Sequence, residues 1–303
     1  MPPSNDMPRI LVLLATHNGA PWLDEQLRSI VEQRDVRVSI VASDDQSADG
    51  TPELLRRWAN EAPLQVLPAA AGRLGAAGNF LRLLRDADLE GFDFVALADQ
   101  DDIWRPERLS RAATRLRERG IDGYSSDVAA FWPDGQRRTL GKAYPQRASD
   151  HLFEPAGPGC TYVMSARLAA AAQRELQREP QRFEGIGYHD WLLYAFARLH
   201  GFGWFIDSEP GVLYRQHGHN ELGANLGTSA IARRWGRLTS GWFRNQVLSI
   251  ATFWPGAPPE VIDRLRRLSL SDRLWLAAHA SRLRRRPRDQ LALAAMLVLG
   301  VLR

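Results

Sequence analysis

The sequence contains a single cysteine, Cys160, and no apolar run long enough to span a bilayer. One cysteine excludes an internal disulfide and favours a reducing compartment. The first nine residues lack the basic and then apolar order of a secretory signal. We therefore expect a cytoplasmic protein, either free in the cytoplasm or bound peripherally to the inner face of the membrane.

Two common nucleotide-binding fingerprints are also missing. Lysine is scarce, and none follows a glycine-rich loop, which excludes a Walker-type phosphate site. Gly72, Gly75 and Gly78 are spaced in threes and follow no strand of convincing length, so they do not form the dinucleotide-binding motif. A bound diphosphate would need another source of positive charge.

With 45% hydrophobic and 24% charged residues, the composition is that of a folded globular protein. The net charge is +4, but the excess of basic residues is concentrated near the C-terminus. That cluster consists of Arg282, Arg284, Arg285, Arg286 and Arg288. Because the first half carries no such cluster, we expect no nucleic-acid partner.

Apolar runs alternate with amphipathic segments through the first hundred residues. The expected strands and helices cover, in alternating order, residues 10–15, 21–33, 36–42, 52–60, 64–67, 77–86 and 92–98. The uninterrupted first run suits a strand buried on both faces of a parallel sheet. This order predicts an α/β fold, Rossmann-like, with a mostly parallel central sheet flanked by helices.

The second half of the chain is less regular. Further strands are expected at 124–131, 159–165, 203–206 and 212–215, and further helices at 166–177 and 191–199. A helical, arginine-rich character from Leu222 onward places a domain boundary near Asn225. Residues 1–225 would then form one domain and 226–303 a helical C-terminal extension. The apolar stretch at 291–302 predicts a helix that lies on a membrane surface, or one that is buried against the first domain or a dimer partner.

Three carboxylates, Asp99, Asp101 and Asp102, follow the strand at 92–98 directly. Carboxylates this close repel one another, so the arrangement suits a hard divalent metal ion or a paired base. A solvated turn is the alternative, because aspartate is common in turns. Ligands gather at the carboxyl ends of parallel strands, so the loops at 16–19 and 43–51 should face the same crevice. A metal ion held by Asp99 and Asp101 would neutralise a diphosphate, which favours transfer chemistry in which a nucleoside diphosphate leaves.

Six blocks of residues resemble the family 2 glycosyltransferases, which have the GT-A fold, and more narrowly their bacterial rhamnosyltransferase-like branch. The blocks lie in the family's order at 15–19, 43–51, 79–80, 98–104, 189–191 and 214–220. Together they cover roughly residues 9–225, and the C-terminal part carries no such match.

The resemblance assigns the nucleotide of the donor to the first two strand-end loops. Asp45 corresponds to the acid that reads the imide of uracil or thymine, and Thr16 and Asn18 would line the base and ribose. A helix-capping turn is the alternative explanation for Asp44 and Asp45. Thr16 and Asn18 could instead satisfy the backbone at the strand ends.

The acidic residues match the D-x-D pair of the family. The resemblance makes Asp101 the direct ligand of Mg²⁺ or Mn²⁺ and places Asp99 nearer the ribose or a metal-bound water. Asp102 either joins them or caps the helix that Pro106 begins. His217 would add a ligand through a neutral imidazole.

Asp190 matches the general base, which deprotonates the acceptor hydroxyl as it attacks the anomeric carbon. The alternative is that Asp190 caps the helix that follows it. His189 stands where many relatives have an acid and would orient Asp190 or contact the acceptor. Arg215 would face the diphosphate. Aromatic rings stack on sugars, so Trp104 would contact the acceptor or diphosphate side of the site, whereas core packing explains Trp191 equally well.

The resemblance implies an inverting glycosyltransferase that moves L-rhamnose from dTDP-L-rhamnose to a hydroxyl of a bacterial surface glycan, such as lipopolysaccharide core or O-antigen. The partners implied are a dTDP- or UDP-sugar donor and a glycan or glycolipid acceptor. A UDP-hexose transferase of the same fold and a non-catalytic nucleotide-sugar-binding module are the rival interpretations. A metal-dependent phosphohydrolase is disfavoured, because Ile103 stands where its motif has threonine.

Overall fold

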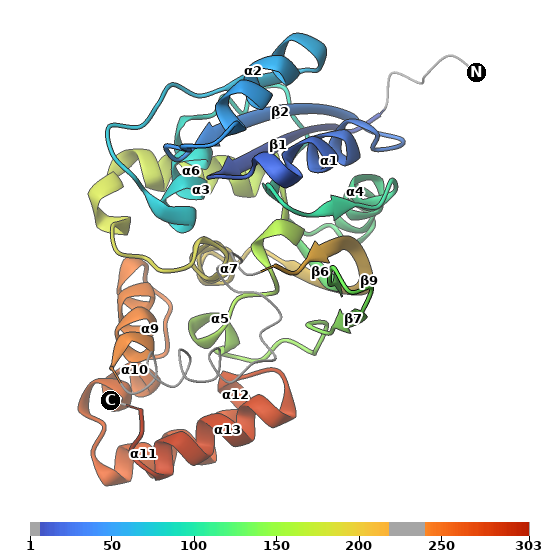
Figure 1. Ribbon diagram of the computed structural model, residues 1–303. Coiled ribbons are helices and arrows are strands. Elements are labelled where there is room, and N and C mark those ends of the chain that lie inside the picture. Colours follow the sequence, from blue (N-terminus) through green and yellow to red (C-terminus); the bar gives the residue numbers. More distant parts are fainter. Residues whose placement is uncertain (1–6, 218–239, 303) are drawn as a thin grey trace. The chain divides into compact units, whose positions relative to one another are not determined.

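A computed structural model describes residues 7–217 and 240–302 of the chain (Figure 1). Its residues pack into two units. The described part of the first unit comprises 7–143, 157–190 and 202–217, and that of the second comprises 144–156, 191–201 and 240–302. The boundary expected near Asn225 lies outside the described residues. The division at that point stays a prediction, but two segments from the middle of the chain pack with the C-terminal helices.

The first unit is built on one nine-stranded sheet in the order β3-β2-β1-β4-β8-β6-β9-β5, with β7 paired to β6. In chain order the strands are β1 (Arg9–Thr16), β2 (Arg37–Asp44), β3 (Leu64–Val66), β4 (Phe94–Asp99), β5 (Ile103–Trp104), β6 (Gly123–Phe131), β7 (Arg137–Leu140), β8 (Val163–Ser165) and β9 (Trp204–Arg215). β1 to β4 are mutually parallel, and β6 is parallel to β9, whereas β5, β7 and β8 pair in the antiparallel sense. The expected α/β fold with a mostly parallel sheet is confirmed.

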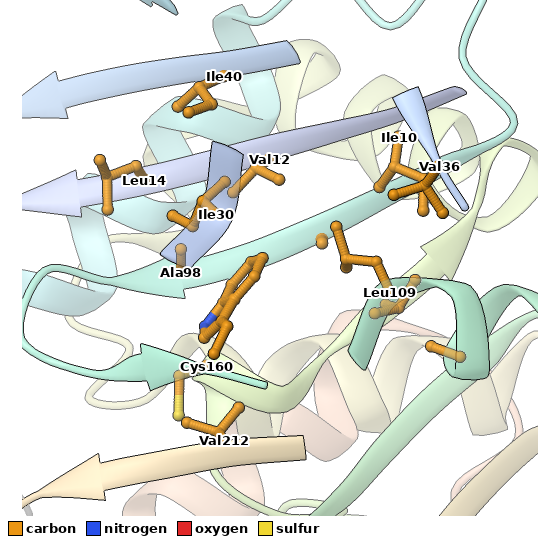
Figure 2. Packing of buried hydrophobic residues seen from close by; sticks show 14 of the residues in the cluster. Ile10, Val12, Leu14, Ile30, Val36, Ile40, Ala98, Leu109, Cys160 and Val212 are labelled. Atoms are coloured by element: carbon orange, nitrogen blue, oxygen red, sulfur yellow. The ribbon is translucent and has the colours of Figure 1, made fainter. Parts of the chain in front are cut away.

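The apolar runs form the strands because both faces of the sheet are covered. The helices of this unit are α1 (Ala20–Val31), α2 (Thr51–Glu61), α3 (Gly75–Asp86), α4 (Arg108–Arg119) and α6 (Ala166–Arg178). Alternate residues of β1, namely Ile10, Val12 and Leu14, face the helices α1, α2 and α4, with Ile30 of α1 among their neighbours (Figure 2). α3 and α6 pack against the sheet on the other side, beside β1 and β4. The continuous run 10–15 is therefore buried throughout.

Two expected strands, 203–206 and 212–215, are one continuous strand, β9. The polar stretch between them suggested a break, but β6 pairs with β9 on both sides of it. The register shifts between Ser126 and Val128 of β6, so the extra residues of β9 are taken up as an irregularity within the ladder. The strand expected at 159–165 is shorter, because a 3₁₀ turn, η1 (Gly159–Thr161), precedes β8.

The second unit is helical in its described part. It contains α5 (Asp150–Phe153), α9 (Trp242–Phe253), α10 (Pro259–Arg267), α11 (Leu270–Ala278), α12 (Ala280–Leu283) and α13 (Pro287–Val298). α7 (His189–Leu199) begins in the first unit with two residues and continues in the second. None of the helices within 7–217 and 240–302 has the length and apolar character needed to cross a bilayer.

A buried ionic cluster holds the second unit together around Asp150, which is fully buried. Its carboxylate accepts hydrogen bonds from the Tyr194 hydroxyl at 2.9 Å, from Arg198 at 3.1 Å and from Arg285 at 2.9 Å. Arg284 donates to the Phe153 carbonyl at 2.9 Å. Arg284 and Arg285 of the C-terminal cluster therefore make contacts inside the unit, and Arg285 supplies one of the cations that the buried Asp150 carboxylate needs.

Candidate active site

Gln100 fastens the end of β4 to the loop after β1. Its Oε1 accepts a hydrogen bond from the His17 N–H, and its Nε2 donates to the His17 carbonyl, both at 2.8 Å. A Cβ at Gly19 would overlap the Gln100 amide, so glycine is needed for this close approach. Gln26 of α1 also donates to the Asp99 carbonyl at 2.9 Å. The strand-end loops expected to converge are thus joined by direct hydrogen bonds.

The buried carboxylate of Asp45 binds the first turn of α3. Oδ1 accepts from the Leu74 N–H at 2.7 Å, and Oδ2 accepts from the Gly75 N–H at 2.8 Å. Asp45 therefore satisfies two backbone donors that a helix start leaves unpaired. This matches the capping alternative, although the helix is α3, far along the chain. Each carboxylate oxygen can accept a second hydrogen bond, so the contact with a base stays a prediction.

Thr16 and Asn18 are engaged in the same strand-end loops. The Thr16 hydroxyl donates to Asp44 Oδ1 at 2.8 Å. Asn18 has a φ of 49°, and its Oδ1 accepts from the Ala48 N–H at 2.8 Å, while its own N–H donates to Ser47 Oγ at 2.8 Å. These bonds show that both residues shape the loop, as the structural alternative required. Their contact with a nucleotide is untested.

His217 and Asp101 lie together, as a shared metal site requires. The Nε2 of His217 is 2.8 Å from Asp101 Oδ2. The imidazole stacks on the indole of Trp22, with ring centroids 3.9 Å apart and planes 9° from parallel. Hydrogen bonding on one side and stacking on the other fix the orientation of the ring. The role of Asp101 and His217 as ligands remains a prediction.

A second group of potential ligand atoms involves the neighbours of Asp101 in the acidic turn. One ligand atom each from Asp99, Asp102 and Cys160 lies within 4.8 Å of the others. Burial raises the pKa of the Cys160 thiol well above its usual range, so the thiol keeps its proton and is a poor ligand. Burial also raises the pKa of Asp102 well above its usual range, and the charges of Asp101 and Asp99 add to the effect.

The structure corrects the expectation that Asp102 caps the helix begun by Pro106. α4 starts at Arg108, and within the described residues no side chain caps it. The fully buried Asp102 instead accepts a hydrogen bond from the Arg215 N–H of β9 at 3.3 Å. Two residues of β5 intervene between the acidic turn and the helix, which carries the carboxylate away from the helix start.

Arg215 is tied to protein groups on three sides. Its Nε donates to the Asp101 carbonyl at 2.9 Å, its guanidinium pairs with Glu25, and it lies over the Phe131 ring at 4.8 Å from the centroid. The side chain expected to face a diphosphate therefore supports the backbone of the acidic turn. The contact of Arg215 with a diphosphate stays a prediction.

Trp104 requires a correction. Its ring belongs to the hydrophobic core, is 3% exposed, and lies under the guanidinium of Arg108 at 3.6 Å from the centroid. A ring that is covered on its faces cannot stack on a sugar, so the expected contact of Trp104 with the acceptor or diphosphate is wrong. Trp191 is also buried and donates to the His151 carbonyl at 3.1 Å, which supports the core-packing explanation.

Asp190 lies in the first turn of α7, one residue past its start. The residue is 6% exposed, and the Tyr162 hydroxyl donates to its carbonyl at 3.2 Å. The helix starts at His189, so Asp190 is not the residue that precedes the helix, as the capping alternative supposed. The helix dipole still favours a negative charge at this position. Its role as general base stays a prediction.

Several residues of this region had no role in the sequence analysis. Gln100 and Trp22 fix neighbours of the acidic turn, and Arg73 places its Nη2 2.7 Å from the Nε2 of His17. Gln100 lies inside the D-x-D block, and its place between two acidic residues was the feature of the sequence that could have indicated its role. Trp22 and Arg73 lie in segments whose local pattern indicates only a helix or a loop.

The family model described as glycosyl transferase family 2 matches residues 11–174. The dTDP-rhamnosyl transferase RfbG of Shigella flexneri is 37% identical over 290 residues, which are 95% of this chain and 100% of that protein. The chain belongs to glycosyl transferase family 2. An uncharacterized glycosyltransferase of Nostoc sp. is 26% identical over 229 residues, which cover 73% of this chain and 69% of that one.

Solved glycosyltransferase structures share the fold of this family member. TarS 1-349 of S. aureus, in complex with UDP-GlcNAc, aligns with a TM-score of 0.61 and 14% identity, over 97% of this chain and 82% of that one. The mannosyltransferase PcManGT of Pyrobaculum calidifontis, in complex with GDP-Man and Mn²⁺, aligns with a TM-score of 0.55 and 21% identity, over 99% of this chain and 76% of that one. At these identities the likeness shows the fold, which confirms the GT-A prediction.

We predict that Asp45→Asn destabilises the glycosyltransferase even without any ligand. An asparagine offers one acceptor and one donor, so one backbone N–H of α3 would face another donor. The expected loss is about 1–3 kcal/mol in the free energy of unfolding, measured by urea titration. Asp88→Asn is the matched control, because Asp88 is exposed and accepts a single bond that asparagine retains. Unchanged stability of Asp45→Asn would refute the helix-binding role.

Proposed function

We propose that this glycosyltransferase transfers L-rhamnose from dTDP-L-rhamnose to a hydroxyl of a bacterial surface glycan, such as lipopolysaccharide core or O-antigen, with inversion at the anomeric carbon. The observation that carries the proposal is the likeness to RfbG over nearly the whole chain, together with the carboxylates at the end of β4. The acceptor would be a glycan or glycolipid, and the reaction would take place on the cytosolic side of the inner membrane.

In the proposed reaction a single displacement exchanges one bond for another. Asp190 takes the proton from the acceptor hydroxyl, whose oxygen forms a bond to the anomeric carbon from the face opposite the diphosphate. The bond between that carbon and the diphosphate oxygen breaks, and dTDP leaves with the electron pair. One base suffices for this chemistry, and no covalent sugar intermediate is needed.

The donor set at the acidic turn fits a hard divalent ion. Carboxylate oxygens of Asp99 and Asp101, with the imidazole of His217, are ligands that Mg²⁺ or Mn²⁺ accepts. Asp102 and Cys160 are less suited, because burial raises the pKa of each group and so disfavours the charged form that binds a metal ion. A bound ion would supply positive charge for the leaving diphosphate in a chain where lysine is scarce.

Asp45, Thr16 and Asn18 would receive the nucleotide. Uracil and thymine present the same imide, so this contact suits UDP-sugars as well as dTDP-sugars, and a UDP-hexose is the second candidate donor. A thermal-shift comparison of dTDP, UDP and GDP, each with and without Mn²⁺, ranks the donors, because a ligand that binds the native state raises its stability with affinity.

We predict that Asp190→Asn abolishes transfer while it preserves binding of the donor. Loss of the base should lower kcat by about 10²–10⁴-fold, with dTDP affinity by calorimetry within a few-fold of the unsubstituted enzyme. Glu184→Gln, which changes an exposed carboxylate in the segment before α7, is the matched control. Turnover retained by Asp190→Asn would remove the base assignment.

Removal of the Asp101 carboxylate should abolish the metal dependence of donor binding. For Asp101→Ala we expect that dTDP affinity with Mn²⁺ falls to the value that the unsubstituted enzyme shows in EDTA. Direct Mn²⁺ binding, followed by electron paramagnetic resonance, should weaken in parallel. Asp88→Ala, at an exposed site, should change neither measurement. A Mn²⁺ effect that persists in Asp101→Ala would contradict the ligand role.

We further propose that the predicted C-terminal extension, residues 226–303, contacts the membrane surface. Five large apolar side chains are exposed in this segment: Leu270 and Leu274 on α11, Leu291 and Val298 on α13, and Leu299 directly after α13. The helices α11 and α13 pack against each other (Figure 1). The segment 240–302 carries ten arginines and four acidic residues. Apolar groups beside an excess of positive charge suit an anionic lipid surface, whereas a second copy would bring like charges together.

The Leu291→Glu and Leu299→Glu double variant should weaken sedimentation with phosphatidylglycerol vesicles by tenfold or more, because two exposed leucines would no longer enter the interface. Val31→Glu, at an exposed apolar site in the first unit, is the control and should sediment normally. If vesicle binding is unchanged and analytical ultracentrifugation instead shows that a homodimer dissociates, the face is a dimer contact and the membrane proposal is wrong.

A further inference from the structure

His189 is half-buried at the start of α7, next to the proposed base. It stacks on Phe80 of α3, with ring centroids 4.0 Å apart and planes 26° from parallel. Phe80 is itself 2% exposed, so it forms a fixed floor beneath the imidazole. The Nε2 atom is buried and has no hydrogen-bond partner among the described residues.

Gly159 of η1 makes room for this ring. A Cβ at position 159 would overlap Nε2 of His189, and it would lie 3.0 Å from Cε1 of that ring and 3.3 Å from the Cβ of Asp190. The same short turn leads to Tyr162, whose N–H donates to the Gly159 carbonyl at 2.9 Å and whose hydroxyl donates to the Asp190 carbonyl at 3.2 Å. One segment therefore contacts both residues of the first turn of α7.

The imidazole of His189 does not carry charge near neutral pH. Burial lowers the pKa of His189 to about 3, and no neighbouring charge contributes to the shift. A neutral ring without a hydrogen bond at Nε2 cannot relay a proton or form an ion pair there. The ring of His189 can therefore act only through its packing between Phe80 and Gly159.

We propose that His189 is a positioning residue that fixes the first turn of α7, and with it the carboxylate of Asp190, by packing between Phe80 and Gly159. This inference rests on the proposed function, because it takes Asp190 as the base. A carboxylate that must reach one hydroxyl tolerates little displacement, since a shift of about 1 Å can cost on the order of a hundredfold in rate. The packing should therefore affect turnover and leave donor affinity unchanged.

A double-mutant cycle tests the contact. Gly159→Ala should push the ring and lower kcat by roughly tenfold or more, with dTDP affinity by calorimetry within twofold. His189→Ala should also lower kcat, but adding Gly159→Ala to it should cost less than twofold, because the clashing ring is gone. His189→Phe, which keeps a stacking ring, should retain most of the turnover. Gly141→Ala is the matched control, because its nearest atom would be 3.8 Å away.

The outcomes separate this inference from the proposed function. Additive losses for Gly159→Ala and His189→Ala, or full turnover in His189→Ala, would overturn the positioning role and leave the base assignment intact. Turnover retained in Asp190→Asn would overturn both. Calorimetric dTDP stoichiometry counts the folded enzyme in each variant, so a loss of folded protein is not mistaken for a loss of kcat.

Discussion

The parallel pairing of β1 with both β2 and β4 is the constraint on which the site depends. Thr16 stands opposite Asp44 in one ladder, and Ala15 stands opposite Asp99 in the other. Because β1, β2 and β4 are parallel and in matched register, they end at the same edge of the sheet. The loops that follow these three strands therefore lie next to one another. Gln100 then joins the loop after β4 to the loop after β1 with two hydrogen bonds to His17, and these bonds fix the position of the acidic turn.

The site handles its negative charge with few cations of its own. Asp45 is balanced by two backbone N–H groups at the start of α3, Asp101 is paired with His217, and burial and the neighbouring carboxylates raise the pKa of Asp102. Arg215 donates a hydrogen bond to the Asp101 carbonyl and forms an ion pair with Glu25. This charge balance supports the proposed divalent ion, which would supply the positive charge that a diphosphate needs in a chain where lysine is scarce.

The parts of the molecule that sequence could predict are those that local patterns determine. The run 10–15 had to be buried on both faces, and the carboxylates after 92–98 had to stand at a strand end. The fates of Asp102 and Trp104 depended instead on β5 and β9, whose pairing is not visible in a short window. The roles of Arg284 and Arg285 depended on the segment 150–155, more than a hundred residues earlier, so the sequence did not distinguish a surface cluster from arginines bound inside the unit.

The first turn of α7 shows how an uncharged residue serves a charged one. Two adjacent carboxylates would repel, and each would raise the pKa of the other. Histidine in that place, stacked on Phe80 and neutral, removes the like charge and still fills the space beside Asp190. The cost is an unpartnered nitrogen and the need for glycine at 159. The position of the Asp190 carboxylate is thus set by the packing of the first turn of α7, and the helix dipole favours its negative charge.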